Sequence, residues 1–199
     1  MTGAVDREVV LLRHAKSAWP DVPDHDRPLA PRGRRDAPVM GRWLRAAGLL
    51  PDQVVCSTAR RARETWQLAQ AGLGATPPVR FDTFVYQASA MQLLDLVRGI
   101  PTDTGTLLIV GHDPAVPELA LALATPSRPV GTVAVSGTGP PSVFERMRAK
   151  FPTAAIAVLE FTGSWDELVP GSARLTHFVT PRDLGTSTNQ GSGRRDRRP

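Results

Sequence analysis

The chain has 199 residues, of which 24 are Lys or Arg, 19 are Asp or Glu and 4 are His, so its formal net charge is +5. This length favours one domain with a substantial core. The single cysteine, Cys56, excludes an internal disulfide and a cysteine-based zinc site, which is typical of a reducing compartment. No stretch reaches the roughly 18 apolar residues of a membrane span, and the N-terminus lacks a signal-peptide pattern. We therefore expect a cytoplasmic protein that does not bind membranes.

The position of the positive charge says more than its sum. Within residues 194–198, four arginines against one aspartate contribute +3 of the total. The rest of the chain has no basic stripe with interleaved aromatic residues, so we expect no nucleic-acid partner. From residue 185 onward the sequence has no large apolar side chain. We expect residues 1–184 to form a single domain and residues 185–199 a disordered basic tail.

The first third of the chain predicts a buried strand, a loop and a helix. Residues 9–12 are four consecutive β-formers, which predicts a strand buried on both faces, as in the middle of a parallel sheet. Residues 18–33 contain four prolines and should form a loop. Apolar residues at steps of three and four predict a helix over about 34–47, with Gly48 as its stop and Pro38 in its first turn.

The same alternation continues to the end of the expected domain. Strands are predicted at 53–56, 79–85 and 106–110, and helices after Ser57-Thr58, over 90–98 and from about 116 to 123. Residues 125–142 are rich in Pro, Gly, Ser and Thr and should form a long mobile loop, a candidate lid. A short helix at 143–148 and strands at 154–161 and 173–179 follow. The fold class is therefore α/β, with a doubly wound, mostly parallel sheet and helices on both faces.

Charged and imidazole side chains follow three of these strands. Arg13 and His14 end the first strand, residues 60–63 (Arg-Arg-Ala-Arg) follow the second, and His112 follows the strand at 106–110. The carboxyl ends of parallel strands share one edge of a doubly wound sheet, so these groups should converge there. Arginine offers forked donors to phosphate oxygens, a neutral imidazole can attack phosphorus, and a second imidazole can donate to an oxygen. The pattern predicts a site for phosphoryl transfer, with residues 24–27 (Asp-His-Asp-Arg) in one wall.

The spacing of these groups resembles the histidine phosphatase superfamily, also called the phosphoglycerate mutase-like fold. The resemblance runs from Val9 to Asp183 and rests on Arg13-His14-Ala15, on Ser57 with Arg61-Ala62 and Thr65, and on Gly111-His112. Within the superfamily, the chain is similar to the SixA-type phosphohistidine phosphatases. That similarity rests on the short length, on Asp26-Arg27-Pro28-Leu29 leading to Arg32-Gly33, and on Phe151-Pro152-Thr153.

The resemblance implies a role for each matching residue. His14 would be the nucleophile that forms a phosphohistidine intermediate, while Arg13, Arg61 and His112 would hold the phosphoryl oxygens. Arg61 is chosen because it directly precedes Ala62 in the family's pattern, and its neighbours Arg60 and Arg63 are interpreted as solvated helix charges. Lys16 and Ser17, just past the nucleophile, are further candidates for binding phosphate. The implied enzyme uses no metal and no cofactor, and acts on a phosphorylated protein or a small phosphorylated molecule.

The sequence departs from the family's pattern at two places. Asp113 puts a carboxylate beside the expected phosphate. The superfamily's phosphomonoesterases usually have a glutamate acid after the third strand, whereas residues 81–88 offer only Asp82 as a possible acid. An alkoxide leaving group is about as basic as hydroxide, whose conjugate acid has a pKa of about 15.7, so it needs an acid to protonate it. An imidazole leaving group is far less basic, since its conjugate acid has a pKa of about 6.5. A missing acid therefore favours phosphohistidine as substrate, with Asp82, Asp24 and Asp26 as candidate acids.

Other function classes fit less well. A cysteine phosphatase needs an arginine six places after its cysteine, and the residue six places after Cys56 is Ala62. A metallohydrolase would need paired ligands of the HExxH or HxH type, which the chain lacks. A broad small-molecule phosphomonoesterase of the same superfamily remains an alternative. So does a regulatory module that binds phosphate and has lost turnover.

Overall fold

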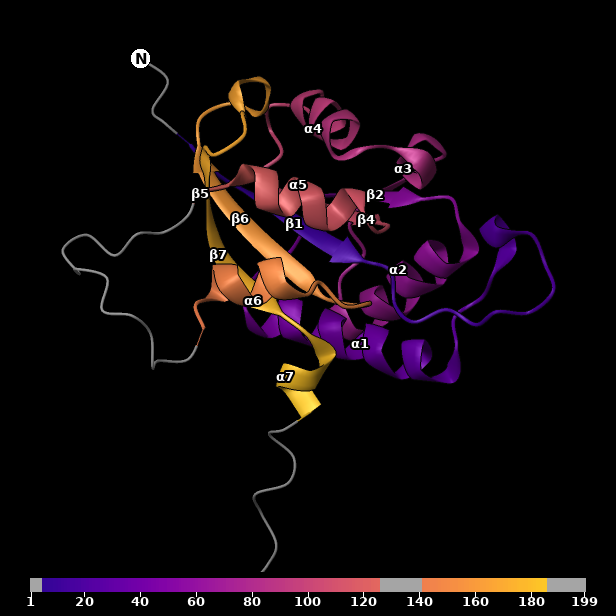
Figure 1. Cartoon of the computed structure of the whole chain (residues 1–199). Helices are drawn as coiled ribbons and strands as arrows, with labels where there is room; N and C mark the ends of the chain where they lie inside the picture. The colour runs from indigo at the N-terminus through magenta and orange to yellow at the C-terminus, as the bar shows by residue number, and fades with distance from the viewer. Residues whose placement is uncertain (1–4, 126–140, 186–199) are drawn as a thin grey trace, which may run out of the picture.

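A central sheet organises the part of the chain that the computed structural model describes, residues 5–125 and 141–185. The sheet has seven strands in the order β3-β2-β4-β1-β6-β7-β5 (Figure 1). Their bounds are Asp6–Arg13 (β1), Gln53–Ser57 (β2), Val79–Asp82 (β3), Thr106–Gly111 (β4), Ala124–Thr125 (β5), Ile156–Thr162 (β6) and Ala173–Val179 (β7).

The strand directions fix where the carboxyl ends lie. β1 runs parallel to β4, β4 parallel to β2, and β2 parallel to β3. On the other side of β1, β6 is antiparallel to β1 and β7 is antiparallel to β6, while β5 is parallel to β7. The expected mostly parallel α/β sheet is confirmed. The carboxyl ends of β1, β2, β3 and β4 therefore share one edge of the sheet.

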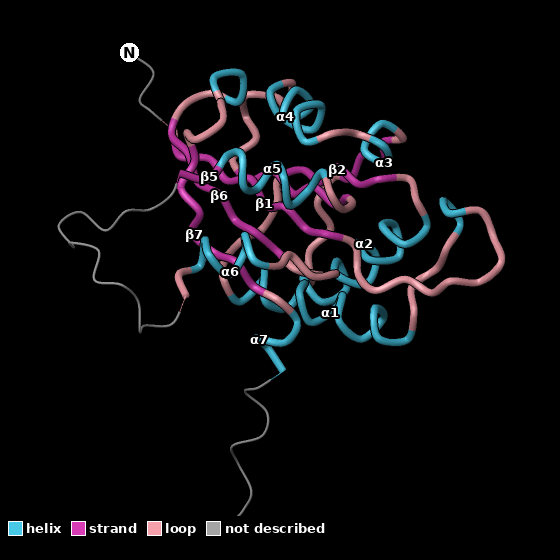
Figure 2. Tube along the Cα trace, viewed as in Figure 1, coloured by secondary structure: helices cyan, strands magenta, loops and turns pink. Residues whose placement is uncertain are grey.

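Helices cover both faces of the sheet, as Figures 1 and 2 show. Their bounds are Pro31–Ala46 (α1), Arg60–Leu73 (α2), Phe84–Gln87 (α3), Ala90–Arg98 (α4), Ala115–Leu123 (α5), Val143–Ala149 (α6) and Pro181–Gly185 (α7), with 3₁₀ turns at Asp24–Asp26 (η1) and Trp165–Glu167 (η2). Val9 and Leu11 pack in one core cluster with α4 and α5, and Val10 and Leu12 in another with α1 and α2. All four are fully buried, which confirms the prediction for residues 9–12.

Three local predictions were wrong. Helix α1 begins at Pro31, because a proline is well suited to the first helical position, where its missing N–H needs no partner; Pro38 therefore lies inside the helix and not in its first turn. Helix α2 follows Ser57-Thr58 as predicted, but its N-cap is Ala59 without a side-chain cap, so neither Ser57 nor Thr58 has the expected capping role. The strand expected at 79–85 ends at Asp82, where the Asp82 carboxylate accepts the Phe84 N–H at the start of α3.

Two predicted segments lie mostly outside the described residues. The long loop expected at 125–142 falls largely on residues 126–140, and the tail expected at 185–199 falls largely on residues 186–199. Across residues 5–125 and 141–185, the helices are all too short or too polar to cross a membrane.

Candidate active site

His14 lies at the carboxyl end of β1 with its imidazole buried. Its Nδ1 is 2.8 Å from the carbonyl oxygen of Ala15. A carbonyl oxygen only accepts hydrogen bonds, so Nδ1 carries the proton and Nε2 keeps its lone pair. Burial, followed by the charges of Arg61, Arg13 and Arg27, lowers the pKa of His14 to about 4. The ring is therefore neutral at neutral pH and can act as a nucleophile.

Backbone hydrogen bonds hold His14 in place from three directions. Its N–H donates to the carbonyl of Gly111 at the end of β4, at 2.9 Å. Its carbonyl accepts from Ala154, a buried alanine with φ of 62°, a conformation that costs an L-residue about 1–2 kcal/mol. The Thr65 hydroxyl accepts from Ala15 and donates to the Arg61 carbonyl, which ties the loop that follows His14 to α2. The Thr65 position in the sequence motif thus has a structural explanation.

His112 follows β4 and lies beside His14, with 5.1 Å between the two ring centroids. Its Nε2 is 2.7 Å from the Ser57 hydroxyl at the end of β2, and its buried Nδ1 has no partner in the described part of the chain. If Ser57 donates to Nε2, Nδ1 carries the proton and can donate to a phosphoryl oxygen. Burial lowers the pKa of His112 to about 3, helped by the repulsion that two protonated rings, His112 and His14, would feel and by the charge of Arg61, so this ring is also neutral.

Arg61, in the first turn of α2, is buried and is held by the Asp24 segment. It donates to the Asp24 carbonyl at 2.6 Å and to an Asp24 carboxylate oxygen at 2.9 Å. The same carboxylate accepts from the Tyr86 hydroxyl at 2.6 Å and from Arg27 at 2.7 Å. The Tyr86 hydroxyl, then Arg27 and Arg61, hold the pKa of Asp24 well below its usual range. Asp24 is therefore a carboxylate and has no proton to donate as an acid.

Arg13 is the last residue of β1. Its guanidinium donates to the Phe151 carbonyl at 2.6 Å and lies 3.6 Å from the Asp113 carboxylate. The Phe151-Pro152-Thr153 segment, which the sequence marks as distinctive, thus orients this arginine. The Asp113 side chain is half exposed and faces Arg13.

Sequence reasoning missed Arg27, which the structure places in the site. Its buried guanidinium donates to the Ser17 hydroxyl at 2.8 Å and to the Ala18 carbonyl at 3.0 Å, in addition to Asp24. Its charge also reaches His14, because it contributes to the lowered pKa of that ring. The signal was the arginine of Asp26-Arg27-Pro28-Leu29, which the sequence offered as a family marker without a role. Ser17 is buried and held by Arg27.

The remaining candidates are held by other partners. Asp82 accepts from the Phe84 N–H at 2.9 Å and lies 3.5 Å from Arg80. Arg60 is exposed and pairs with Glu64, which agrees with its interpretation as a solvated helix charge. Cys56 is a buried strand thiol whose pKa burial raises. Residues 5–125 and 141–185 contain no group of three or more His, Cys, Asp or Glu side chains that could hold a metal ion.

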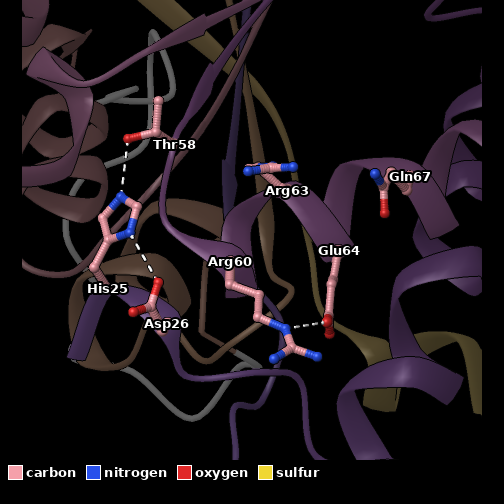
Figure 3. A pocket seen from close by; sticks show the side chains of 7 residues that line it. All are labelled: His25, Asp26, Thr58, Arg60, Arg63, Glu64 and Gln67. Atoms are coloured by element: carbon pink, nitrogen blue, oxygen red, sulfur yellow. Dashed lines mark hydrogen bonds and ion pairs between the residues drawn. The ribbon is translucent and has the colours of Figure 1, made fainter. Parts of the chain in front are cut away.

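A polar cavity of about 270 Å³ opens between η1 and the start of α2 (Figure 3). Figure 3 shows His25 between Thr58, 3.0 Å from Nε2, and Asp26, 3.5 Å from Nδ1. His25 also makes an edge contact with Tyr86, which in turn contacts His112. The Asp24–Arg27 segment therefore does form a wall beside the phosphoryl site, as the sequence predicted.

Comparisons with known proteins agree with this geometry. Residues 9–84 match the family model of the histidine phosphatase superfamily (branch 1). The chain is 45% identical to the uncharacterized protein Rv1276c of Mycobacterium tuberculosis, over 86% of this chain and 100% of the relative. A candidate phosphohistidine phosphatase SixA from Nakamurella multipartitia is 36% identical, with a TM-score of 0.71 over 88% of this chain and 96% of that one. A second such SixA structure, from Agrobacterium tumefaciens, is 26% identical with a TM-score of 0.68, over 88% and 98%.

Proposed function

Because the chain belongs to the histidine phosphatase superfamily and is a SixA-like phosphatase, we propose that His14 is its nucleophile and protein phosphohistidine its substrate. The observation that carries the proposal is the His14 ring itself. Its Nδ1 proton is donated to the Ala15 carbonyl, its Nε2 lone pair remains available, and burial, together with three arginine charges, lowers its pKa and keeps the ring neutral.

In the first step, the His14 Nε2 lone pair attacks phosphorus and forms a new P–N bond. The substrate ring reacts with its other nitrogen protonated by solvent, so that when the substrate P–N bond breaks its electron pair returns to the ring nitrogen and a neutral imidazole leaves. Arg13, Arg61 and the Nδ1–H of His112 stabilise the charge on the phosphoryl oxygens during transfer. Arg27 and Ser17 are further donors at the same place.

In the second step, a water molecule attacks the phosphorus of phosphorylated His14. The new P–O bond forms as the P–N bond to Nε2 breaks, and the electron pair returns to the imidazole. The products are inorganic phosphate and neutral His14. The low pKa of His14 suits this step, because a weakly basic imidazole is a good leaving group.

The choice of phosphohistidine rests on the acids that the site offers. Asp24 is kept ionised by three donors, and Asp82 is engaged by the Phe84 N–H and by Arg80. A carboxylic acid poised to protonate a leaving alkoxide would need a raised pKa. An imidazole leaving group does not need such an acid, since its conjugate acid has a pKa of about 6.5.

A panel of four substrates with the purified full chain tests the proposal. Phosphohistidine peptide, phosphoramidate, an aryl phosphate and an alkyl phosphate are compared by phosphate release, each with and without chelator. We expect the first three to far outrun the alkyl phosphate, and chelator to leave all rates unchanged. Should the alkyl phosphate be fastest, the chain is a small-molecule phosphomonoesterase. If none is hydrolysed, it is a phosphate-binding module.

A further inference from the structure

A second cavity, of about 310 Å³, lies next to the nucleophile's segment. Arg13 and Lys16, which flank His14 in the sequence, form part of its lining. The rest comes from three other segments: Arg32 of α1, residues 150–153 after α6, and residues 180–182 at the start of α7. The cavity is therefore built by four parts of the chain that the fold brings together beside the phosphoryl site.

The lining of this cavity carries positive charge and no carboxylate. Its five cations are Arg13, Lys16, Arg32, Lys150 and Arg182, and its other members are prolines and threonines. Arg32 pairs with Asp36 outside the lining, and Arg13 with Asp113. Among the described residues, no carboxylate lies within ion-pair distance of Lys16, Lys150 or Arg182. Clustered like charges raise the potential in a concave site and attract anions into it.

Arg13 gives a second, independent sign of a ligand. Its Nε is buried and has no hydrogen-bond partner in the described part of the chain, although its other nitrogens contact Phe151 and Asp113. A buried, charged donor without a partner costs free energy that a bound anion would recover. Arg13 belongs to both the phosphoryl site and the cavity, so one substrate can reach the two together.

The cavity's walls are held by interactions that do not consume its charge. The Phe151 carbonyl fixes Arg13, and Arg146 of α6 pairs with Asp183 of α7 at 2.8 Å. The latter pair ties the helix that precedes Lys150 to the helix that carries Arg182. These two exposed cations therefore face the cavity from neighbouring, linked segments.

We propose that this cavity binds an acidic group that the substrate carries in addition to the transferred phosphoryl group. The proposal rests on the proposed function, since it assigns the cavity to the substrate of the same site. In a phosphohistidine protein, the acidic group is a carboxylate near the phosphorylated residue; in a smaller substrate it is a carboxylate or a second phosphate. The shared chemistry is an oxyanion met by Lys and Arg donors and by the hydroxyl of Thr153, since the Thr180 hydroxyl already donates to the Asp183 carboxylate.

Paired substrates test this assignment by kinetics. One pair is a phosphohistidine peptide with flanking Glu residues and the same peptide with Gln; the other is 4-carboxyphenyl phosphate and phenyl phosphate. We expect the Lys150→Ala, Arg182→Ala double variant to lose about tenfold in kcat/KM on the acidic member of a pair and less than about twofold on its neutral partner. The pair that responds identifies the source of the acidic group. Arg148→Ala, which removes the same charge near Lys150 but outside the cavity, should behave as wild type.

An NMR titration with inorganic phosphate tests the cavity without turnover. In the His14→Ala protein, the backbone amide signals of Thr153 and Thr180 should shift and saturate, and adding the double substitution should abolish those shifts while Arg148→Ala should not. If the amides do not respond, or respond equally in the double variant, the cavity is not an anion site, whatever the phosphatase activity. If they respond but neither substrate pair discriminates, the cavity does not serve the substrate and the proposal is overturned.

Discussion

The two sides of the phosphoryl site are held by different forces. His14 is fixed through backbone groups of β1, β4 and the segment at Ala154, and its loop is tied to α2 by the uncharged hydroxyl of Thr65. The opposite side, around Asp24, is held by charged and hydroxyl side chains, those of Arg27, Arg61 and Tyr86. The uncharged contacts around His14 should not change when phosphate binds. The contacts of Asp24 occupy Arg27 and Arg61, which are the donors proposed to bind phosphate. The His14 side is therefore held without charged groups, while the Asp24 side depends on charge.

Removing the proposed nucleophile, His14, should have the largest effect. We expect His14→Ala to lower turnover of phosphohistidine peptide below detection, because no other described group has a free imidazole lone pair at the end of β1. Phosphate release measures it, and circular dichroism checks that the backbone-held fold is kept. Retention of most of the activity would contradict the assignment of His14.

Loss of a phosphoryl donor should be the next largest effect. Arg61→Ala and His112→Ala should each lower kcat/KM by about two orders of magnitude, on the order of 3 kcal/mol, as for loss of one oxyanion donor. Arg60→Ala is the matched control, since Arg60 is exposed and pairs with Glu64. A larger loss of kcat/KM in Arg60→Ala than in Arg61→Ala would mean that Arg60, and not Arg61, is the phosphoryl donor.

Asp24→Asn tests whether the charge of Asp24 competes with phosphate for its arginine partners. The substitution keeps the size of the side chain and removes a negative charge that engages both Arg61 and Arg27. We expect inorganic phosphate to inhibit several-fold more strongly, because a like charge no longer opposes it. Asp82→Asn, which removes a carboxylate that pairs with Arg80, should leave inhibition unchanged. Weaker inhibition in Asp24→Asn would mean that Asp24 serves chiefly to orient Arg61.

The pH dependence should be the smallest effect near neutrality. In the proposed mechanism neutral His14 is the active form, and its pKa is lowered to about 4. The value of kcat/KM on an aryl phosphate should therefore stay flat from pH 7 to about 5 once the substrate's own ionisation is corrected for. It should then fall as His14 is protonated. A midpoint near the ordinary histidine pKa of about 6.5 would show that the ring is not shielded as described.

The same lowered pKa values bear on stability. His14 and His112 bind protons more weakly in the folded chain than in the unfolded one, where the pKa is about 6.5. The contribution of these two rings to the free energy of unfolding is therefore fully present above about pH 6.5. It is lost as the pH falls from about 6.5 towards 4 for His14 and towards 3 for His112. Acid unfolding monitored by circular dichroism should reflect this, and the activity profile must be read within the folded range.

The sequence predicted the strands and the residues at their carboxyl ends, but not the hydrogen-bond partners of the side chains there. Residues 9–12 and 106–110 are continuous apolar runs, so their strands, and the groups that end them, followed from pattern alone. Helix α4 was predicted at its observed bounds, Ala90–Arg98. The start of α1 was missed because proline was taken as a helix breaker, although Pro31 occupies the first helical position, where proline is favoured.

The site residues that pattern could not supply depend on long-range contacts. Arg27 sits in a loop of mixed charges, and only the fold shows that it is buried and donates to Ser17 and Asp24. Likewise, three donors from three segments make Asp24 an unsuitable acid, although its position in the sequence left it open as one. The cationic cavity is assembled from four segments, so no local spacing could have revealed it.

The most direct test of the account is to trap phosphate on His14. The wild-type chain is mixed with phosphoramidate, quenched at alkaline pH within the first turnover and digested, and the peptide containing Arg13 to Lys16 is examined by mass spectrometry. We predict one acid-labile phosphoryl group on His14, absent from His14→Ala and accumulating in proportion to enzyme. Rapid hydrolysis of phosphoramidate with no phosphorylated His14 at any quench time would contradict the covalent mechanism.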